Sequence, residues 1–311
     1  MNVVYMGTPD FAVLPLKALI ENGYNVTGVI TQPDKPVGRK AILTPPPVKT
    51  VAVENGIPVF QPCTLKNGEG VKILRELKPD VVIVVAYGKI LPADFLEFPK
   101  YGCINIHGSV LPKYRGAAPI QWSVLNGDEY SGVTSMQLNE GLDTGDMLIC
   151  EKLKIGEDET SGELYERLSP LGASVLLKTL DLLKSDALSP VKQNDSESSY
   201  ASMLDKSMSP VDWSLSSSEI HNKIRGLDPW PVASTLLNGK TLKLFKSHIT
   251  GEKSQKCAGS VITDKNGLKV VCGDGVCISI SEVQYEGKKR MSSVDFFRGF
   301  KTDSDTVLGN C

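Results

Sequence analysis

Apolar residues in the first two thirds of the chain fall into short continuous runs that are separated by stretches with helical spacing. The runs at Asn2–Gly7 and at residues 80–87 are typical of parallel strands buried on both faces of a sheet. Between them, apolar residues recur over positions 11–19 at the spacing of one helix face. We expect Thr8 to cap this helix and Pro9 to be its first residue, since proline is favoured at that position.

The same alternation continues to about residue 183. It predicts strands at residues 25–31, 58–60, 103–107, 131–137 and 146–155, and helices at residues 48–54, 71–77 and from a capping box at Thr160 and Glu163 to about Leu183. Strands alternating with helices predict an α/β fold with a doubly wound, mostly parallel sheet covered by helices on both faces. Ligands of such sheets bind beyond the carboxyl ends of the strands, where His107 falls.

The pattern changes near residue 190. Residues 190–207 are polar and rich in serine, which is the composition of a linker. After a short helix capped by Ser216 and Glu219, five alternating runs separated by turn residues predict a small β-barrel of oligonucleotide-binding (OB) type; the runs are 232–237, 241–245, 259–262, 268–271 and 276–280. We therefore expect a catalytic domain at 1–189, a linker at 190–207 and an OB-like domain at 208–311.

Composition and charge limit the class of protein. A hydrophobic content of 41% and a charged content of 23% over 311 residues are ordinary for a water-soluble globular protein. We find no membrane-spanning run and no secretory signal, and the seven cysteines lack framework spacing, so we expect reduced thiols, a cytoplasmic location and a monomer. The net charge is −2, but from Ser207 onward 14 Lys and Arg face 11 Asp and Glu, which permits a nucleic-acid-facing module without requiring one.

Candidate chemistry is concentrated in two segments. Asn105 and His107 end a predicted strand, and Asp143 lies in the later segment GLDTGDM. An amide, an imidazole and a carboxylate supply what acyl or formyl transfer needs: a donor to the developing oxyanion, a proton carrier and a group that orients that carrier. The alternative is that Asn105 and His107 only satisfy the backbone at a strand end.

Other motifs are incomplete. Gly7 ends the first strand without a G-x-G-x-x-G pattern, which argues against dinucleotide binding. The surroundings of Ser109 do not form a nucleophile elbow, so a covalent serine mechanism is disfavoured. Cys272 and Cys277 have no second pair at zinc-binding spacing, and we expect no metal.

Several segments resemble the folate-dependent formyltransferases. They are AYGKILP (86–92), CINIHGSVLPKYRGAAPIQW (103–122) and GLDTGDM (141–147); GTPDFA, TQPDKPVGR, PPPVK and RGLDPWP support a match to the branch of that family that acts on initiator tRNA in translation initiation. The resemblance covers nearly the whole chain. It implies a Rossmann-like formyltransferase fold and transfer of the formyl group of 10-formyltetrahydrofolate to the α-amine of methionyl initiator tRNA. It also implies that Asn105, His107 and Asp143 are catalytic.

The resemblance also implies ligand contacts. The implied folate-binding residues are Tyr87, Gly88, Ile90, Leu91, Pro92, Ser109, Val110, Leu111 and Pro112. Val110 departs from the family, which usually has leucine there. The segment 33–47, which has neither helical nor strand periodicity, corresponds to a loop that enters the acceptor stem, so Arg39 and Lys40 are implied tRNA contacts. From its charge, we also expect Lys206 of the linker to contact tRNA.

Three rival functions share parts of this pattern. Another folate-dependent transferase that acts on a small amine would keep the three catalytic residues but would not need the β-rich C-terminal part. A non-catalytic tRNA-binding protein would not need an intact Asn-x-His pair with Asp143. A formyl-folate hydrolase would need neither the basic loop nor the barrel.

Overall fold

The computed structural model describes residues 1–38, 40–264, 267–300, 303 and 305–309, so Arg39 lies outside the described residues. The chain forms two compact units. The first comprises 1–119, 131–153 and 165–201, and the second comprises 120–130, 154–164 and 202–311. Two short internal segments thus belong to the unit that contains the C-terminal part of the chain.

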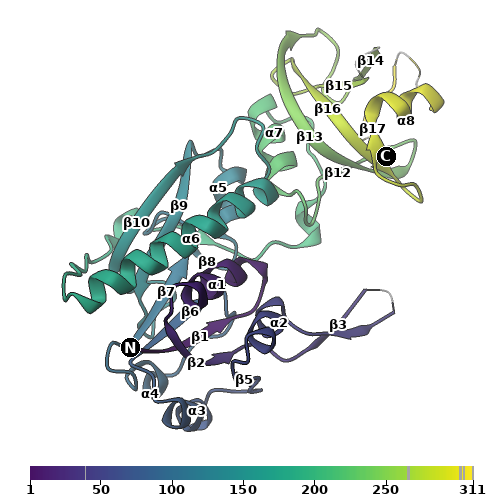
Figure 1. Ribbon diagram of the computed structural model, residues 1–311. Coiled ribbons are helices and arrows are strands. Elements are labelled where there is room, and N and C mark those ends of the chain that lie inside the picture. Colours follow the sequence, from purple (N-terminus) through teal and green to yellow (C-terminus); the bar gives the residue numbers. More distant parts are fainter. Residues whose placement is uncertain (39, 265–266, 301–302, 304, 310–311) are drawn as a thin grey trace. The chain divides into compact units, whose positions relative to one another are not determined.

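The first unit is built on a seven-stranded sheet (Figure 1). Its order is β10 (Met147–Lys154), β9 (Tyr130–Gln137), β7 (Cys103–His107), β6 (Val81–Val85), β1 (Asn2–Gly7), β2 (Asn25–Ile30) and β5 (Val59–Phe60). Neighbours from β7 to β5 pair in parallel, and β9 pairs antiparallel with β7. The predicted α/β fold with a mostly parallel sheet is confirmed.

Helices cover both faces of this sheet. Side chains of α3 (Glu69–Leu77) and α4 (Ala93–Leu96) join a buried cluster on the face that carries Val4 and Met6. On the other face, the Tyr5 hydroxyl donates to the Ala12 carbonyl just before α1 (Val13–Glu21). Thr179 of α6 (Ser161–Lys184) donates to Ser135 on β9 at 2.7 Å, and α2 (Pro47–Glu54) lies beside α1.

Two predictions about the N-terminal third are wrong. Residues 10–12 form a 3-10 helix, η1 (Asp10–Ala12), and α1 begins only at Val13. The Thr8 hydroxyl caps no helix: the residue at the N-cap of η1 is Pro9, and the hydroxyl instead donates to the Tyr87 carbonyl at 3.3 Å. The segment without strand periodicity contains an antiparallel hairpin, β3 (Lys35–Val37) and β4 (Ile42–Thr44), whose strand residues are all exposed. Without a buried face, such a hairpin leaves no apolar alternation in the sequence.

The two capping boxes predicted from the sequence are confirmed. The Thr160 hydroxyl accepts from the Glu163 main-chain nitrogen while the Glu163 carboxylate accepts from the Thr160 nitrogen, as a capping box requires. The same reciprocal pair joins Ser216 and Glu219 at the start of α7 (Ser217–Gly226). Each box satisfies main-chain donors that the first helical turn leaves without partners.

The second unit contains an antiparallel sheet that curves as a half-barrel, which confirms the predicted small β-barrel. Its strands are β12 (Ser234–Leu237), β13 (Lys240–Lys253), β16 (Val276–Tyr285), β15 (Gly267–Val271) and β14 (Val261–Asp264) in spatial order, and β17 (Met291–Ser292) pairs with β16. This unit also contains α7 and α8 (Ser293–Gly299). It includes α5 (Pro119–Leu125) as well, except for Pro119.

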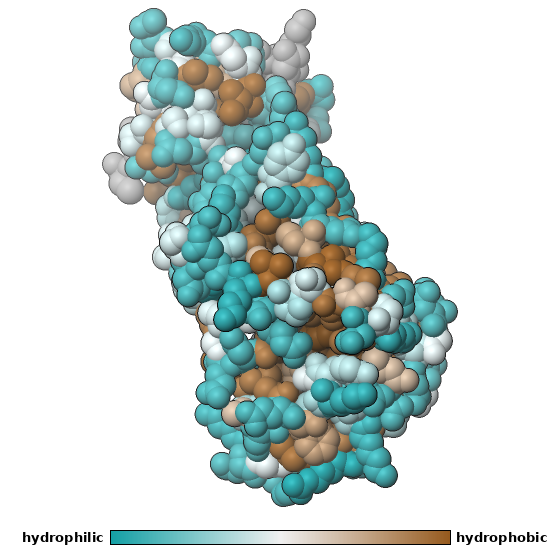
Figure 2. Space-filling view, turned by 90° about the vertical axis from the view of Figure 1, so that its left-hand side faces the viewer, coloured by the Kyte–Doolittle hydropathy of each residue, from teal (hydrophilic) through white to brown (hydrophobic). Residues whose placement is uncertain are grey.

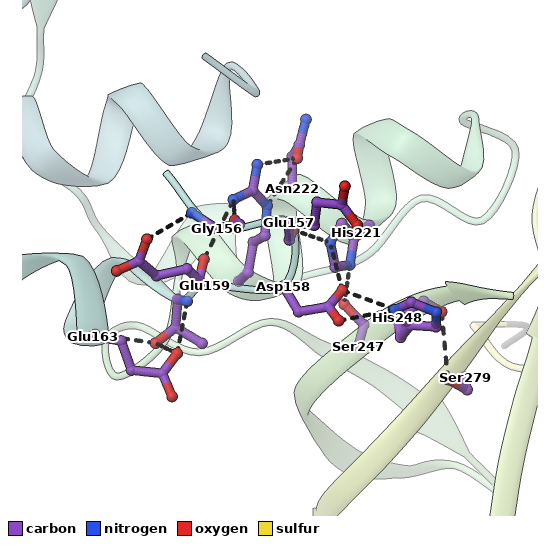
Figure 3. A network of polar contacts seen from close by, with 12 residues as sticks. Gly156, Glu157, Asp158, Glu159, Glu163, His221, Asn222, Ser247, His248 and Ser279 are labelled. Carbon is purple, nitrogen blue, oxygen red and sulfur yellow. Dashed lines mark hydrogen bonds and ion pairs between the residues drawn. The ribbon is translucent and has the colours of Figure 1, made fainter. Parts of the chain in front are cut away.

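A polar network joins α7 and β13 to the turn at residues 156–159 within the second unit (Figure 3). The buried His221 of α7 donates from Nε2 to the Glu157 carbonyl at 2.9 Å and accepts at Nδ1 from Ser247 at 2.8 Å. Arg225 donates to the carbonyls of Gly156 and Glu159. The internal segment 154–164 is therefore held by residues of the C-terminal part.

The exposed surface of the first unit carries both apolar and hydrophilic side chains. Figure 2 shows apolar side chains lying between hydrophilic ones on one face of the first unit. Among the exposed large apolar residues of this unit are Leu142, Val191 and Tyr200. In the described ranges, no helix is both long and apolar enough to cross a membrane.

Candidate active site

Asn105 and His107 lie at the carboxyl end of β7 in the first unit. Side chains two residues apart on a strand point to the same face, so the Asn-x-His spacing directs the amide and the imidazole to one side of the sheet. Both are buried, with exposed fractions of 9% for Asn105 and 6% for His107. Buried polar groups at a strand end are candidates for chemistry because their burial is costly unless a partner satisfies them.

The His107 ring has a fixed orientation. Its Nε2 lies 2.9 Å from the Tyr114 carbonyl oxygen. A carbonyl can only accept, so Nε2 carries a hydrogen and donates it. The other ring nitrogen, Nδ1, lies 3.8 Å from Oδ2 of Asp143, which is too long for a hydrogen bond but close enough for a charge interaction. Protonation at Nδ1 would place a positive charge beside this carboxylate.

Asp143 is held by main-chain and side-chain partners. Its Oδ2 accepts from the Gly116 nitrogen at 2.8 Å, and its backbone has φ of 52°, in the left-handed region. Two residues later, a Cβ on Gly145 would lie 1.6 Å from the Gln137 carbonyl oxygen, so only glycine fits at that position. The segment therefore folds tightly enough to direct the carboxylate toward the end of β7.

The Asn105 side chain differs from those of His107 and Asp143 in its hydrogen bonding. No described residue forms a hydrogen bond with its side chain. The amide can thus donate to a bound molecule without first giving up a protein partner. The structure brings together His107 and Asp143 directly and places Asn105 on the same face of β7.

The segment after β7 is held by a compact set of hydrogen bonds. The Ser109 hydroxyl donates to the Lys113 carbonyl at 2.7 Å, and Thr134 on β9 donates to the Ser109 carbonyl and accepts from the Leu111 nitrogen. The peptide bond before Pro112 is cis. Ser109 is buried and its hydroxyl proton is committed, which agrees with the expectation that it is not a nucleophile.

The segment after β6 joins buried anchors to exposed backbone. Tyr87 and Leu91 are buried, while Gly88 and Ile90 are exposed. The Tyr87 carbonyl accepts from Gln32 at 3.1 Å, but its buried hydroxyl has no partner among the described residues. Burial raises the pKa of this hydroxyl to about 12, so it stays protonated and able to donate.

The residues expected to contact tRNA lie on exposed segments. Lys40 is exposed in the turn between β3 and β4, and Lys206 is exposed in the 3-10 helix η3 (Lys206–Met208). Arg39 lies outside the described residues. The hairpin also exposes the apolar side chains of Val37 and Leu43, at 57% and 64%.

Lys49 follows the hairpin but is not free for a ligand. Its ammonium group lies 2.8 Å from the Asp34 carboxylate and 2.9 Å from Gln61. Hydrogen bonds from Gln61 and then from Lys49 lower the pKa of Asp34. This ion pair anchors the base of the hairpin.

The segment interpreted as a linker reaches the candidate site. β11 (Tyr200–Ala201) pairs in parallel with β8 (Arg115–Gly116), and the Gln193 amide bonds to the Asp143 turn. Sequence reasoning missed these residues because a polar, serine-rich composition carries no signal for a specific long-range contact. Within the described part of the chain, no group of three His, Cys, Asp or Glu side chains could hold a metal ion.

Comparison with known proteins gives the family of the chain. Residues 1–180 match the Formyl transferase family, and residues 203–301 match the Formyl transferase C-terminal domain. The chain therefore belongs to the formyl transferase family, which confirms the resemblance, and it is an enzyme of that family.

Its full-length relatives narrow the comparison. The chain is 50% identical to methionyl-tRNA formyltransferase of Clostridium novyi, over 99% of this chain and 100% of the relative. It is 47% identical to the protein of that name from Geobacter metallireducens, over 100% of this chain and 99% of the relative. A solved sugar 3N-formyl transferase, WlaRD, shares the fold with a TM-score of 0.71 and 23% identity, covering 93% of this chain and 99% of the other.

Proposed function

We propose that this enzyme transfers the formyl group of 10-formyltetrahydrofolate to the α-amino group of methionyl initiator tRNA. The amine attacks directly, through an oxyanion stabilised by Asn105 and His107. The observation that carries this proposal is the approach of His107 to Asp143 at the end of β7, on the face that also carries the buried Asn105 amide. Relatives that match nearly the whole chain at up to 50% identity are named methionyl-tRNA formyltransferase, which supports the choice of acceptor.

The charges that develop in this reaction match the three side chains. The amine adds to the formyl carbon of the bound 10-formyltetrahydrofolate to give a tetrahedral oxyanion, and the carbon–N10 bond breaks when that oxyanion collapses. The formyl oxygen gains negative charge, which the Asn105 amide can stabilise by donation. Since Nε2 of His107 already donates to Tyr114, the ring exchanges protons or donates through Nδ1. Asp143, 3.8 Å from Nδ1, orients the ring in this proposal.

Proton transfer completes the balance. The attacking amine loses a proton and the departing N10 gains one, so a single carrier can serve both steps. His107, or an ordered water near Asp143, fills this role in our proposal. The reaction requires no enzyme nucleophile, which agrees with the commitment of the Ser109 hydroxyl to Lys113.

Folate binding is proposed at the two segments that follow β6 and β7. A pterin ring is flat, with donors and acceptors along its edge, so apolar walls with main-chain partners suit it. The segment 87–92 offers such a combination, and the buried, protonated Tyr87 hydroxyl is one donor without a protein partner among the described residues. The residues 109–112 form the other wall in this proposal.

Contacts with tRNA are proposed for Arg39, Lys40 and Lys206. The exposure of Lys40 and Lys206 supports this role, and arginine can bridge phosphates or read base edges with two hydrogen bonds. The half-barrel of the second unit is proposed as a docking module. We also propose that the enzyme acts in the cytoplasm as a monomer.

One assay tests the function. The protein is incubated with formyl-labelled 10-formyltetrahydrofolate and a mixture of aminoacylated tRNAs, and the labelled amino acid is identified after deacylation. We expect label on methionine from initiator tRNA. Label on a different amino acid, or transfer only to small amines or to water, would contradict the proposal.

A further inference from the structure

We propose that Gln193 is a positioning residue for the His107–Asp143 pair, and that the segment 193–201 is part of the catalytic apparatus. This inference deepens the proposed function and rests on it for the role of Asp143. It follows from contacts that the serine-rich composition of the segment does not reveal.

Gln193 uses all the polar atoms of its side chain at the candidate site. Its Nε2 donates to the main-chain oxygens of Asp143 and Gly145, each at 2.8 Å. Its Oε1 accepts from Nε of Arg115 at 3.0 Å. The orientation of the amide is unambiguous, because a flipped amide would turn its oxygen toward two carbonyl oxygens.

The two carbonyls that Gln193 joins enclose a constrained turn. Asp143 has a positive φ, a conformation that costs a non-glycine residue energy unless its surroundings hold it. Gln193 is the side chain that ties Asp143 and Gly145 together from outside the turn. Without it, the carboxylate would lose a restraint on its distance from Nδ1 of His107.

Ser199, in the same segment, holds Tyr114, the hydrogen-bond partner of His107. Ser199 accepts at its hydroxyl from the Tyr114 nitrogen at 2.9 Å, and its carbonyl accepts from the Arg115 nitrogen at 2.9 Å. The Tyr114 carbonyl is the acceptor for His107, and the Gly116 nitrogen donates to Asp143. One strip of chain, residues 114–116, thus carries a partner of each member of the pair.

Pairing of β8 with β11 adds main-chain hydrogen bonds between the same two stretches of chain. The Ala117 nitrogen donates to the Ala201 carbonyl at 2.9 Å. A Cβ on Gly116 would lie 2.7 Å from that same carbonyl oxygen, so the two strands approach closely at this point. The segment 193–201 therefore fixes both sides of the 3.8 Å contact, His107 through Tyr114 and Asp143 through Gln193 and Gly116.

The test compares Q193M with N22A. The methionine keeps the length of the side chain but removes both donors and the acceptor. Asn22 is the control because it is also an amide that donates to a main-chain carbonyl, that of Ala18 at 2.8 Å, but it lies at the exposed end of α1. Kinetics with 10-formyltetrahydrofolate and methionyl initiator tRNA are measured for both variants, together with thermal unfolding.

We expect Q193M to lower kcat roughly 10- to 100-fold, the scale of a misplaced catalytic group, with little change in KM for folate. N22A should retain wild-type kcat. In a D143A background, Q193M should lower kcat no further, since residues that act as one unit are not additive. Wild-type kcat in Q193M, or losses that multiply with those of D143A, would overturn the inference.

A spectroscopic readout separates this inference from the proposed acceptor. The chain has three histidines, His107, His221 and His248, so ring signals labelled with ¹⁵N can be assigned by single substitution. Q193M should move the His107 signals and leave the other two in place. If the protein formylates no tRNA but this shift occurs, the proposed acceptor fails and the positioning role stands. Unchanged His107 signals would refute the positioning role whatever the acceptor.

A second variant keeps the test decidable if Q193M does not fold. S199A removes the hydroxyl that accepts from the Tyr114 nitrogen, on the side of the contact that holds His107. We expect a smaller loss of kcat with S199A, and a shift of the His107 signals through Tyr114. Wild-type kcat and unchanged signals in S199A would contradict the role assigned to the segment.

Discussion

At the scale of single residues, Asn105 differs from His107 and Asp143 in having no hydrogen-bonded partner among the described residues. Neighbouring groups position His107 and Asp143. Nε2 of His107 already donates to the Tyr114 carbonyl, and Oδ2 of Asp143 already accepts from the Gly116 nitrogen. The Asn105 amide keeps both its donors for a ligand. It is therefore the cleanest probe of oxyanion stabilisation.

Replacing Asn105 by alanine should lower kcat by about 10²–10³, the typical cost of removing one oxyanion donor. N105D should be at least as harmful, because a carboxylate repels the developing oxyanion. The rates are measured by transfer of labelled formyl. A matched control is N2A, since Asn2 is an amide at the amino end of β1 and donates to the Lys78 carbonyl. Comparable rates for N105A and N2A would remove Asn105 from the mechanism.

His221 shows that a buried histidine need not be catalytic. Burial, followed by the smaller effect of the Arg225 charge, lowers its pKa, although the Glu157 carbonyl and Asp158 act in the opposite direction. The unfolded chain therefore binds a proton at this ring more readily than the folded protein does. The contribution of neutral His221 to stability is present above the ordinary pKa of 6.5 and is lost as the pH falls below it toward the lower folded value.

Substitution of His221 by glutamine should remove this dependence. We expect H221Q to be less stable than the wild type by roughly 1–3 kcal/mol at pH 8, because Ser247 and the Glu157 carbonyl lose a well-placed partner. The difference should shrink as the pH is lowered from 7 to 5. Urea unfolding over that range measures it, with the exposed His248 in H248Q as control. A constant difference across the range would show that His221 is not the titrating group.

At the scale of elements, the β3–β4 hairpin carries the tRNA contacts that we propose. Its exposed strand residues indicate that it contributes little to the core of the first unit. Its base is fixed by the Lys49–Asp34 pair, so the turn with Lys40 can be changed without disturbing the sheet.

Replacing Arg39 by alanine should raise KM for tRNA roughly 10-fold, the cost of one good bidentate contact, and leave KM for folate unchanged. Steady-state kinetics with each substrate varied in turn provide the measurement. K17A is the control, because Lys17 is an exposed residue of α1 away from the hairpin in sequence. An equal effect of both substitutions would point to bulk charge rather than to a specific contact.

The sequence predicts the elements that bury a face and misses those that do not. β7 could be predicted to the residue because all five of its side chains are buried, and both capping boxes follow from local spacing. The hairpin has no buried face, and the short β8 and β11 strands hold two residues each. Asn105, His107 and Asp143 could be proposed from residue type and spacing, and their catalytic roles stay a prediction. Gln193 could not be found in this way, since its contacts lie 48 and 50 residues away along the chain.

At the scale of the whole molecule, the second unit is assembled from three parts of the chain. Arg225 and His221 of the C-terminal part hold the turn at 156–159. A truncation at residue 207 would strip this turn of its partners, so it would test folding as well as docking. The domain boundaries at 189 and 208 stay a prediction, and charge substitutions are the sharper probe of tRNA docking.

Lys243 is suited to such a probe because it is exposed on β13 and, within the described ranges, forms no ion pair. K243E should weaken tRNA binding and lower the slope of log affinity against log salt by about one if the residue contacts a phosphate. Binding is measured between low and physiological salt. Lys178, whose ammonium pairs with Glu151 in the first unit, gives the control K178E. An unchanged slope for K243E would place Lys243 outside the docking surface.

The most direct test is the single-turnover rate of formyl transfer in H107A and D143A. The rate is measured with saturating 10-formyltetrahydrofolate and saturating methionyl initiator tRNA. Loss of the proton carrier should slow the step by roughly 10²–10⁴ in H107A, and D143A should be slowed severely as well. The control variants are H248A and D146A, the latter only three residues from Asp143, and both should react at close to the wild-type rate. Near-normal rates in both H107A and D143A would contradict the account, because the approach of the imidazole to the carboxylate would then have no part in the reaction.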